Sequence, residues 1–416
     1  MGGTKMGKFI VMDIVFYAGS LNYDQGTGNY QELKKITKWD GKQYTLVSRA
    51  ALRYSLLETG RQLNKWKLAD ASAFTKGVAN SIPKDVRSST ESSEVIEESD
   101  DNDDSNKKSK KNKDTIQPSA EMLLSGELLN YPEFDLFGYL ITNTSPQNFR
   151  ESAVKISHAI SLTPFMYDNH LCGNLGLAQR LIKQTGKMEP NLFNLEEHYT
   201  YYLYSIVIDV ERVGSYTVYL AKNKEQELFG KKIKINNVQI DNLKIILSEN
   251  KTDGIQVQVV EGISVHGEEN DEVIELTFSL TDKSKIIERI KSLVKSVLEL
   301  KRNIKGQSHS LEPKVLVAGV YEGNYKTYKD KISLIDEYTE ECTEETLPQE
   351  NGKKVTIKVK KNKKPVFEVV GIDAKEPIEN ILDYLFNKEE DNKDSIISKE
   401  SKVFWSEEIQ LAENKK

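Results

Sequence analysis

The sequence predicts an α+β fold whose strands and helices follow the ferredoxin-like order βαββαβ, with long insertions between them. Two observations carry this prediction. Residues 9–18 are β-rich and apolar on both faces, which is typical of a strand at the centre of a sheet. Residues 284–302 place a stripe of aliphatic side chains opposite lysines, as on a helix that packs against a sheet. The other elements can be placed around these two.

The first helix of this order is expected at residues 49–59, directly after the first strand and its loop. Ser48 can cap it, because a serine hydroxyl accepts a hydrogen bond from a free amide of the first turn. Leu52 and Leu56 belong to its apolar stripe, and Gly60 is the expected C-terminal stop. We then expect strands at 135–141, 201–213, 254–260, 273–280 and, after the second helix, 313–320.

The composition indicates a water-soluble globular protein. The chain has 416 residues, 38% of them hydrophobic and 29% charged. Cys172 and Cys342 lack C-x-x-C spacing and cannot form a disulfide framework, which favours a reducing compartment. The longest apolar run, 9–18, contains Asp13 and is too short to cross a bilayer. We expect a cytoplasmic protein with no membrane attachment.

The net charge of −6 is a sum over unlike segments. Residues 1–87 contain 14 Lys and Arg against 7 Asp and Glu, so the N-terminal region is basic. Residues 88–114 are acidic and serine-rich, then lysine-rich, with few large apolar side chains; we expect a disordered loop. Its lysines could contact nucleic acid, although a solvated loop is the simpler interpretation. Because a phosphate responds to the local field, the basic region leaves a nucleic-acid partner open.

Familiar catalytic and cofactor motifs are missing from the sequence. It has no G-x-x-x-x-G-K-[ST], no G-x-G-x-x-G between a strand and a helix, no H-E-x-x-H and no G-x-S-x-G. His158, His170, Cys172 and His198 could be imagined as zinc ligands, but they lack the paired spacing of structural zinc sites. We expect no cofactor and no metal.

The region from Asn22 to Arg61 is the best candidate for a binding site. A polar glycine-rich loop at 22–29 holds Asn22 and Asn29, and Lys34 and Lys35 follow it. Arg49 and Arg53 are four residues apart in the expected helix, so they share a face near its positive end. Two guanidinium groups beside free amides suit a phosphate. The alternative is that Arg49 pairs with a surface acid such as Glu58.

Three segments resemble the DevR-type Cas-seven family, the repeated backbone subunit of type I CRISPR Cascade complexes, and subtype I-B most. The first is residues 13–60, with Val-Ser-Arg-Ala-Ala-Leu-Arg-Tyr at 47–54. The second is Phe-Gly-Tyr-Leu at 137–140 followed by Val-Lys-Ile-Ser-His-Ala-Ile-Ser at 154–161. The third joins 201–213 and 284–302 to Lys-Gly-Gln-Ser at 305–308. They occur in the family's order and cover somewhat under half of the chain.

The resemblance implies a ferredoxin-like (RRM-like) palm with fingers and thumb insertions, in a protein of the RAMP class. The palm would comprise residues 1–60, 135–162 with the central strand, and 201–335. The fingers would be 61–134 with the disordered 88–114, the thumb 163–200, and 336–416 would form C-terminal strands, a helix and a polar tail. The family also implies residues for gripping the sugar-phosphate backbone: Ser48, Arg49 and Arg53, with Asn22, Asn29, Lys34 and Lys35 nearby, Lys155, Ser157 and His158 on the central strand, Lys305, Gln307 and Ser308 after the long helix, and Arg150, Arg180 and Lys183 along the thumb.

The function implied is that of a non-catalytic CRISPR RNA (crRNA)-binding protein in antiviral defence. Its partners would be CRISPR RNA, the target DNA strand paired to the guide, other copies of itself and other Cascade subunits. Leu140, Phe165 and Met166 are candidate apolar wedges between bases, or core residues. Two alternatives stay open: a type III-like endonuclease that uses Asp24, and a regulatory protein acting alone.

Overall fold

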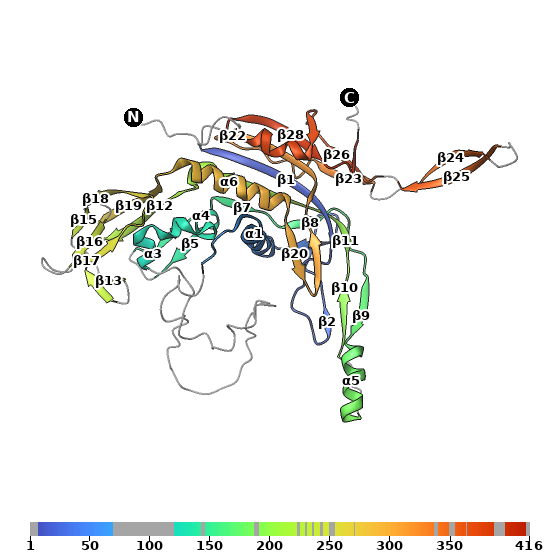
Figure 1. Cartoon of the computed structure of the whole chain (residues 1–416), viewed down its shortest axis with the longest axis horizontal. Helices are drawn as coiled ribbons and strands as arrows, with labels where there is room; N and C mark the ends of the chain where they lie inside the picture. Colours follow the sequence, from blue (N-terminus) through green and yellow to red (C-terminus); the bar gives the residue numbers. More distant parts are fainter. Residues whose placement is uncertain are drawn as a thin grey trace. The chain divides into compact units, whose positions relative to one another are not determined.

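The computed structural model describes residues 7–69, 120–142, 146–186, 191–222, 225–228, 231–234, 237–241, 244–248, 254–269, 271–336, 340–348, 354–362, 364–386 and 396–412. The predicted disordered loop 88–114 lies outside these ranges. The chain, drawn in Figure 1, divides into two compact units. Unit 1 comprises Met1–Trp66, Ala153–Val213 and Lys283–Lys416, and unit 2 comprises Lys67–Ser152 and Gly214–Asp282.

A nine-stranded sheet forms the centre of unit 1, with strand order β27-β28-β22-β1-β11-β8-β4-β3 and with β7 also paired to β11. The central strand β1 runs antiparallel to both β11 and β22. Every residue of β1 from Ile10 to Phe16 is buried, which confirms the predicted buried strand. The bounds are β1 (Lys8–Gly19), β3 (Lys35–Thr37), β4 (Gln43–Val47), β7 (Val154–Ile156), β8 (Ala159–Ser161), β11 (Tyr199–Asp209), β22 (Pro313–Glu322), β27 (Lys375–Pro377) and β28 (Lys399–Trp405).

Two long helices, α1 (Arg49–Asn64) and α6 (Lys283–Leu298), lie on the same side of β1 in Figure 1. Polar side chains join them: Asn64 Nδ2 donates to Ser296 Oγ at 2.8 Å, and Trp66 Nε1 donates to Ser292 Oγ at 3.0 Å. The apolar face of α6 is buried as its sequence predicts. The helix ends at Leu298, short of the predicted residue 302, because Lys301 begins strand β20.

Gly60 does not end the first helix, so the predicted stop at this residue is wrong. The helix α1 continues to Asn64, and Lys65 ends it in a left-handed conformation with φ of 54°. A Cβ atom at Gly60 would lie 2.2 Å from the Trp66 ring. Glycine is therefore required here because the indole packs directly on the helix backbone.

The opposite face of the central sheet carries a second apolar cluster. Val15, Leu203 and Val315 lie side by side on the three central strands and pack with Phe367 of β26. This layer contains the small sheet β23-β26-β29. The elements of this C-terminal part are β23 (Ile332–Asp336), β24 (Glu340–Pro348), β25 (Lys354–Asn362), β26 (Val366–Val369), η5 (Ile378–Asn380), α7 (Ile381–Leu385) and β29 (Gln410–Leu411).

An arm of unit 1 lies between β8 and β11, in the predicted thumb region 163–200. Its sheet has the order β2-β10-β9, and Figure 1 shows helix α5 at the far end of the ribbon formed by β9 and β10. Asn174 caps α5, since its Oδ1 accepts from the Leu177 amide at 3.2 Å. The bounds are β2 (Tyr30–Gln31), β9 (Asn169–Gly173), α5 (Leu175–Thr185) and β10 (Leu192–Glu196).

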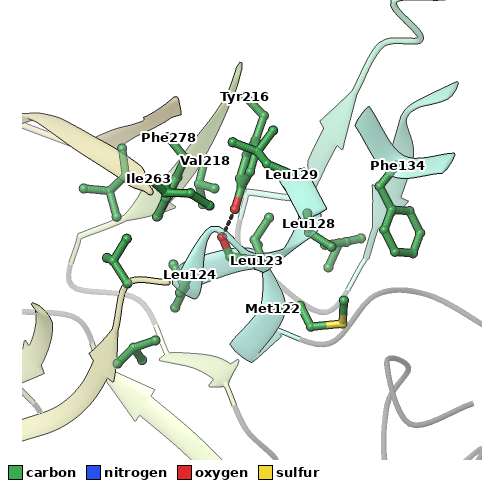
Figure 2. Packing of buried hydrophobic residues seen from close by; sticks show 14 of the residues in the cluster. Met122, Leu123, Leu124, Leu128, Leu129, Phe134, Tyr216, Val218, Ile263 and Phe278 are labelled. Carbon is green, nitrogen blue, oxygen red and sulfur yellow. Dashed lines mark hydrogen bonds between the residues drawn. The ribbon is translucent and has the colours of Figure 1, made fainter. Parts of the chain in front are cut away.

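Unit 2 has a core of its own, shown in Figure 2, in which Phe278, Val218 and Ile263 from a three-stranded sheet pack against Leu123. The Tyr216 hydroxyl donates to the Leu123 carbonyl at 2.6 Å. The bounds are α3 (Ala120–Ser125), η3 (Glu127–Asn130), α4 (Pro132–Phe137), β5 (Tyr139–Ile141), β6 (Asn148–Arg150), β12 (Ser215–Ala221), β13 (Glu225–Leu228), β14 (Lys231–Lys234), β15 (Asn237–Asp241), β16 (Lys244–Ser248), β17 (Gly254–Gln258), β18 (Ile263–Glu269) and β19 (Val273–Leu280).

Unit 2 corrects one prediction of secondary structure. Residues 135–137 end helix α4 and do not form a strand, because Pro132 favours a helix start and Gly138, at φ of 72°, ends that helix. The segments 135–152 and 214–282, which we predicted to be parts of the palm, belong to unit 2. The strand predicted at 273–280 is confirmed. Within the described residues, no helix combines the length and hydropathy that a membrane crossing requires.

Candidate nucleic-acid interface

The start of α1 is built around Ser48, as its sequence predicts. The Ser48 hydroxyl accepts from the Ala51 amide at 3.2 Å, and the Ser48 carbonyl accepts from the Leu52 amide at 3.0 Å. The Ser48 amide in turn donates to Asn22 Oδ1 at 2.8 Å. Asn22 therefore attaches the glycine-rich loop to the helix start with its side chain. Its carbonyl also accepts from the Lys34 amide at 2.9 Å, which holds the other end of the loop.

His158 accepts a hydrogen bond from the next backbone amide of the helix start, that of Arg49. The Arg49 amide donates to His158 Nδ1 at 3.0 Å, so this nitrogen carries no proton. Partial burial, followed by the positive charges of Arg49 and Lys329, lowers the pKa of His158 below its ordinary value of 6.5. The imidazole is therefore neutral at pH 7 and its Nε2 carries the proton. It can donate that proton to an anion without competing with the helix for Nδ1.

A polar network continues from His158 across the sheet face away from α1 and α6. Ser157 Oγ accepts from the Ser205 amide at 2.9 Å and from Lys329 Nζ at 3.2 Å. Asp13 is 1% exposed and accepts from the Ser205 hydroxyl and from the Tyr328 amide at 2.6 Å. Burial raises the pKa of Asp13, while Lys329 partly offsets this effect. Asp13 thus holds the loop that carries Lys329 against the central strand.

Arg49, Arg53 and Lys155 are the exposed cations around this helix start. Arg49 and Arg53 lie one turn apart on α1, which places both guanidinium groups on one exposed face. Lys155 lies on β7, opposite Val207 of β11, and shares the sheet face of Ser157 by strand alternation. Ion pairing of Arg49 with Glu58 was the alternative; Glu58 instead pairs with Arg61 at 2.7 Å.

The hairpin of β20 (Lys301–Ile304) and β21 (Gln307–Ser310) brings another predicted group to the same end of α1. The Lys301 amide donates to Thr59 Oγ1 at 3.3 Å. Arg302, one residue on, donates to the Ala51 carbonyl at 3.3 Å and to the Leu21 carbonyl at 2.7 Å. The hairpin therefore runs toward the N-terminus of α1. Its exposed tip contains the predicted residues Lys305, Gln307 and Ser308.

The lysines at 34 and 35 differ sharply in what they can offer a ligand. Lys34 Nζ is 3.7 Å from Asp24 Oδ1 in an exposed pair, the kind that is worth at most about 1 kcal/mol and can be exchanged for a phosphate. Lys35 Nζ is 2.5 Å from Glu196 Oε2, and the two side chains are 15% and 3% exposed. Lys35 neutralises a buried carboxylate, which leaves its ammonium group little exposed to a ligand.

The remaining predicted residues, Asn29, Arg180 and Lys183, belong to the arm formed by β2, β9, β10 and α5. Asn29 is exposed, and its carbonyl accepts from the Asn194 amide at 2.8 Å to join β2 to β10. Arg180 and Lys183 are exposed on α5. These positions agree with residues that line an arm, but the described contacts do not join them to Arg49.

Arg150, which we predicted to line the thumb, makes its described contacts within unit 2. It lies on β6 in unit 2, and its side chain is 7% exposed. Its guanidinium donates to Asp135 Oδ1 at 2.7 Å, to the Phe134 carbonyl at 2.7 Å and to the Ser215 carbonyl at 3.1 Å. This pattern ties α4, β6 and β12 together, and it turns the cationic group inward.

The family is decided by one comparison. A family model described as CRISPR-associated negative auto-regulator DevR/Csa2 matches residues 10–343. The chain belongs to this DevR/Csa2 family. No curated protein matches the chain.

Distant likenesses exist among solved structures. A chain of a CRISPR RNA-guided surveillance complex, pre-nicking, is similar over 78% of this chain and 81% of its own length, with a TM-score of 0.41 and 8% identity. A chain of another CRISPR RNA-guided surveillance complex is similar over 78% of this chain and 73% of its own length, with a TM-score of 0.36 and 9% identity. Thermofilum pendens Csc2 is similar over 78% of this chain and 69% of its own length, with a TM-score of 0.24 and 9% identity. At this similarity they add nothing to the family assignment.

The candidate wedges of this DevR/Csa2 chain differ in exposure. Met166, 81% exposed, and Leu140, 55% exposed, are available at the surface. Phe165 lies under the Lys35 ammonium, 4.7 Å from its ring centroid, and edge-on to His198 at 5.6 Å. Phe165 therefore belongs to the packing at the root of the arm.

Two lysines that sequence reasoning did not select lie beside the predicted residues of this DevR/Csa2 chain. Lys38 Nζ is 3.4 Å from the Ser161 carbonyl and 3.8 Å from the Tyr44 ring centroid. Lys329 reaches Ser157 from a loop after β22. The spacing of Lys34, Lys35 and Lys38 could have indicated the first. Nothing in the sequence indicated the second, because long-range hydrogen bonds from Tyr328 to Asp13 and from Lys329 to Ser157 place it here.

The histidines considered as zinc ligands have other partners. His198 Nδ1 is 2.8 Å from Thr45 Oγ1, and His170 Nε2 is 3.7 Å from Asp168 Oδ1. In the part of the chain that the structure describes, no group of three or more His, Cys, Asp or Glu side chains is arranged to hold a metal ion.

Proposed function

We propose that this DevR/Csa2-family protein binds CRISPR RNA and polymerises along it as the backbone of a type I Cascade surveillance complex of subtype I-B. The observation that carries the proposal is the helix start at Ser48–Arg53. It combines two exposed arginines, a neutral His158 with a free N–H and a helix N-terminus, all groups that favour phosphate. The target DNA strand paired to the guide, further copies of this chain and other Cascade subunits are its proposed partners.

The chemistry of this surface suits a protein that accepts any guide sequence. Guanidinium, ammonium, imidazole and hydroxyl groups recognise phosphate and ribose, which every nucleotide shares. A base-reading protein would present side chains to base edges in a groove. Because several cations contribute, RNA affinity should fall steeply with salt concentration.

We further propose that the centre of unit 1 is a ferredoxin-like palm. The support is twofold. In the sheet, the four strands have the order β22-β1-β11-β8. Along the chain, α1 comes between β1 and β8, and α6 comes between β11 and β22, which is the βαββαβ order. In this arrangement α1 starts directly after β4, whose last residue, Val47, pairs with Ala159 of β8. Arg49 and Arg53 of α1 and Lys155 of β7 would then lie close together.

We propose that the protein is not a nuclease. Asp24, the candidate for target-RNA cleavage, is engaged in its own loop: its Oδ1 accepts from the Gln25 amide at 3.0 Å and lies 3.7 Å from Lys34 Nζ. These contacts are those of a turn residue. A cleavage assay with target RNA and magnesium should show no product above a protein-free control. Robust cleavage that Asp24→Ala abolishes would favour the type III-like alternative.

Co-purification tests the proposed function. The protein would be expressed beside a CRISPR array, purified at low salt, and its bound nucleic acid extracted and sized. We expect repeat-derived RNA of uniform length, bound to several copies of the protein. A nucleic-acid-free monomer under these conditions would contradict the proposal. Preferential retention of duplex DNA would instead support the regulatory alternative.

A further inference from the structure

The turn between β3 and β4 presents a tryptophan almost entirely to solvent. Trp39 is 97% exposed, whereas Trp66 is 7% exposed and Trp405 is half-buried. Leaving a large aromatic ring in water forgoes the stabilisation that its burial would provide. An exposed tryptophan on an ordered element is available for contact with another molecule.

The hairpin holds this tryptophan in a defined place. The Lys38 amide donates to the Lys42 carbonyl at 3.1 Å, and the Gly41 amide donates to the Lys38 carbonyl at 3.0 Å. Gly41 has a left-handed φ of 74°, as expected in a three-residue hairpin loop. Asp40 completes the turn, since its carboxylate accepts from the Lys42 amide at 3.0 Å and from the Tyr44 hydroxyl at 2.7 Å. The Trp39 backbone is thus fixed before any ligand binds.

The surroundings of Trp39 are cationic. Lys38 and Lys42 flank it in sequence, and the one acid of the turn, Asp40, is already hydrogen-bonded. Lys38 and Lys329 are both partly buried, and burial lowers the pKa of each. Lys38 Nζ donates to the Ser161 carbonyl at 3.4 Å and Lys329 Nζ donates to Ser157 Oγ at 3.2 Å, so both ammonium groups lie against the segment 157–161. Two cations against one short segment favour an anion next to them.

We propose that Trp39 is a stacking platform for an unpaired nucleobase of single-stranded RNA, with Lys38 and Lys329 on the adjoining phosphate. An aromatic ring beside fixed cations matches the alternation of base and phosphate along a single strand. Charge complementarity favours this occupant over a second copy of the chain, whose net charge of −6 is spread over segments of both signs. The inference rests on the proposed function, because it names where one base of the bound RNA lies.

Tryptophan fluorescence tests this assignment directly, because stacking on a base quenches the indole. The probes are ten-nucleotide oligoadenylate and oligouridylate, titrated into RNA-free protein while affinity is followed independently by the anisotropy of a labelled RNA. We expect both to quench wild-type fluorescence at saturation, with oligoadenylate the stronger quencher. Trp39→Phe should lose most of the quench but keep affinity within about threefold, because phenylalanine also stacks.

Trp39→Ala should weaken RNA affinity by about fivefold to a hundredfold, the usual loss for one stacked base. Trp39→Phe is the matched control, and circular dichroism would verify that the hairpin variant keeps its fold. Undiminished quench in Trp39→Phe, or unchanged affinity in Trp39→Ala, would overturn the proposal while leaving salt-dependent RNA binding intact. Absence of RNA binding by wild-type protein would instead overturn the proposed function. A spectral blue shift with protein concentration alone would assign Trp39 to contacts between copies.

Discussion

Unit 2 and the start of α1 in unit 1 use arginine for opposite purposes. Arg150 in unit 2 is 7% exposed and is bound to Asp135 and to backbone carbonyls. Arg49 in unit 1 is exposed beside a helix N-terminus and a neutral histidine. The local sequence around each arginine does not show this difference. The difference teaches that burial and the number of satisfied donors, and not charge, decide which cation can meet a ligand.

Removing Arg150 should have the largest effect and should be confined to stability. Arg150→Ala leaves the Asp135 carboxylate buried without its counter-charge, which typically costs about 3–5 kcal/mol. We expect the thermal unfolding of unit 2 to occur at markedly lower temperature, measured by calorimetry. RNA affinity of the fraction that remains folded should match wild type. Unchanged unfolding together with weaker RNA binding would reverse the roles assigned to the two arginines.

The same comparison can be made between two adjacent lysines. Lys35→Met should reduce the free energy of unfolding by about 3 kcal/mol, because Glu196 then remains buried and unpaired. Lys34→Met, the matched control, should change it by less than about 1 kcal/mol, because its pair with Asp24 is exposed. Chemical denaturation of both variants measures the difference. Equal losses would show that the Lys35–Glu196 pair is no more important than a surface contact.

The arginines of α1 should affect RNA binding and leave stability unchanged. Replacing Arg49 and Arg53 together by Ala should lower RNA affinity by about tenfold to a hundredfold, because charge-assisted hydrogen bonds to phosphate can no longer form. Arg61→Ala, on the same helix but paired with Glu58, is the control and should bind as wild type. Filter binding at fixed salt gives the affinities. Wild-type affinity in the double variant would remove the phosphate role of this surface.

The smallest expected effect concerns pH and His158. Its folded-state pKa lies below the ordinary 6.5, so the unfolded chain binds the proton more readily. Stability is therefore fully present above pH 6.5 and is lost as pH falls through 6.5 toward the folded-state value. Because His158 is exposed, the loss should stay below about 1 kcal/mol. His158→Asn keeps an acceptor for the Arg49 amide but does not titrate, and its unfolding should lack this component between pH 7.5 and 5.5. An identical pH dependence in both proteins would contradict the assignment.

The elements that could be predicted from the sequence are those whose own patterns are strong. The apolar strand β1, the capped start of α1, the amphipathic face of α6 and the strand 273–280 all follow from local pattern. Gly60 and residues 135–137 were mispredicted because tertiary contacts or a local proline overrode the pattern. The division into units also could not be predicted, since unit 2 joins segments separated by more than sixty residues in the chain.

The candidate site was predictable only in part, for the same physical reason. Ser48, Arg49 and Arg53 are close in sequence, so local spacing places them together, whereas Asn22 is 26 residues from Ser48. The ion pair of Lys35 could not be predicted, because its partner, Glu196, is 161 residues away in the chain. Lys329 was missed because its position depends on a hydrogen bond to Asp13. Long-range partners determine whether a lysine can meet a ligand, and they have no signature in the local sequence.

The salt dependence of RNA affinity, measured on two unrelated single-stranded RNA sequences of equal length, tests the central claim most directly. A sequence-neutral phosphate surface predicts equal affinities within a few-fold and a steep, common slope of log affinity against log salt. The Arg49 and Arg53 double variant should reduce that slope by about 1.4, because each phosphate neutralised on a single strand accounts for about 0.7. A shallow slope, or affinity for one sequence only, would contradict the account.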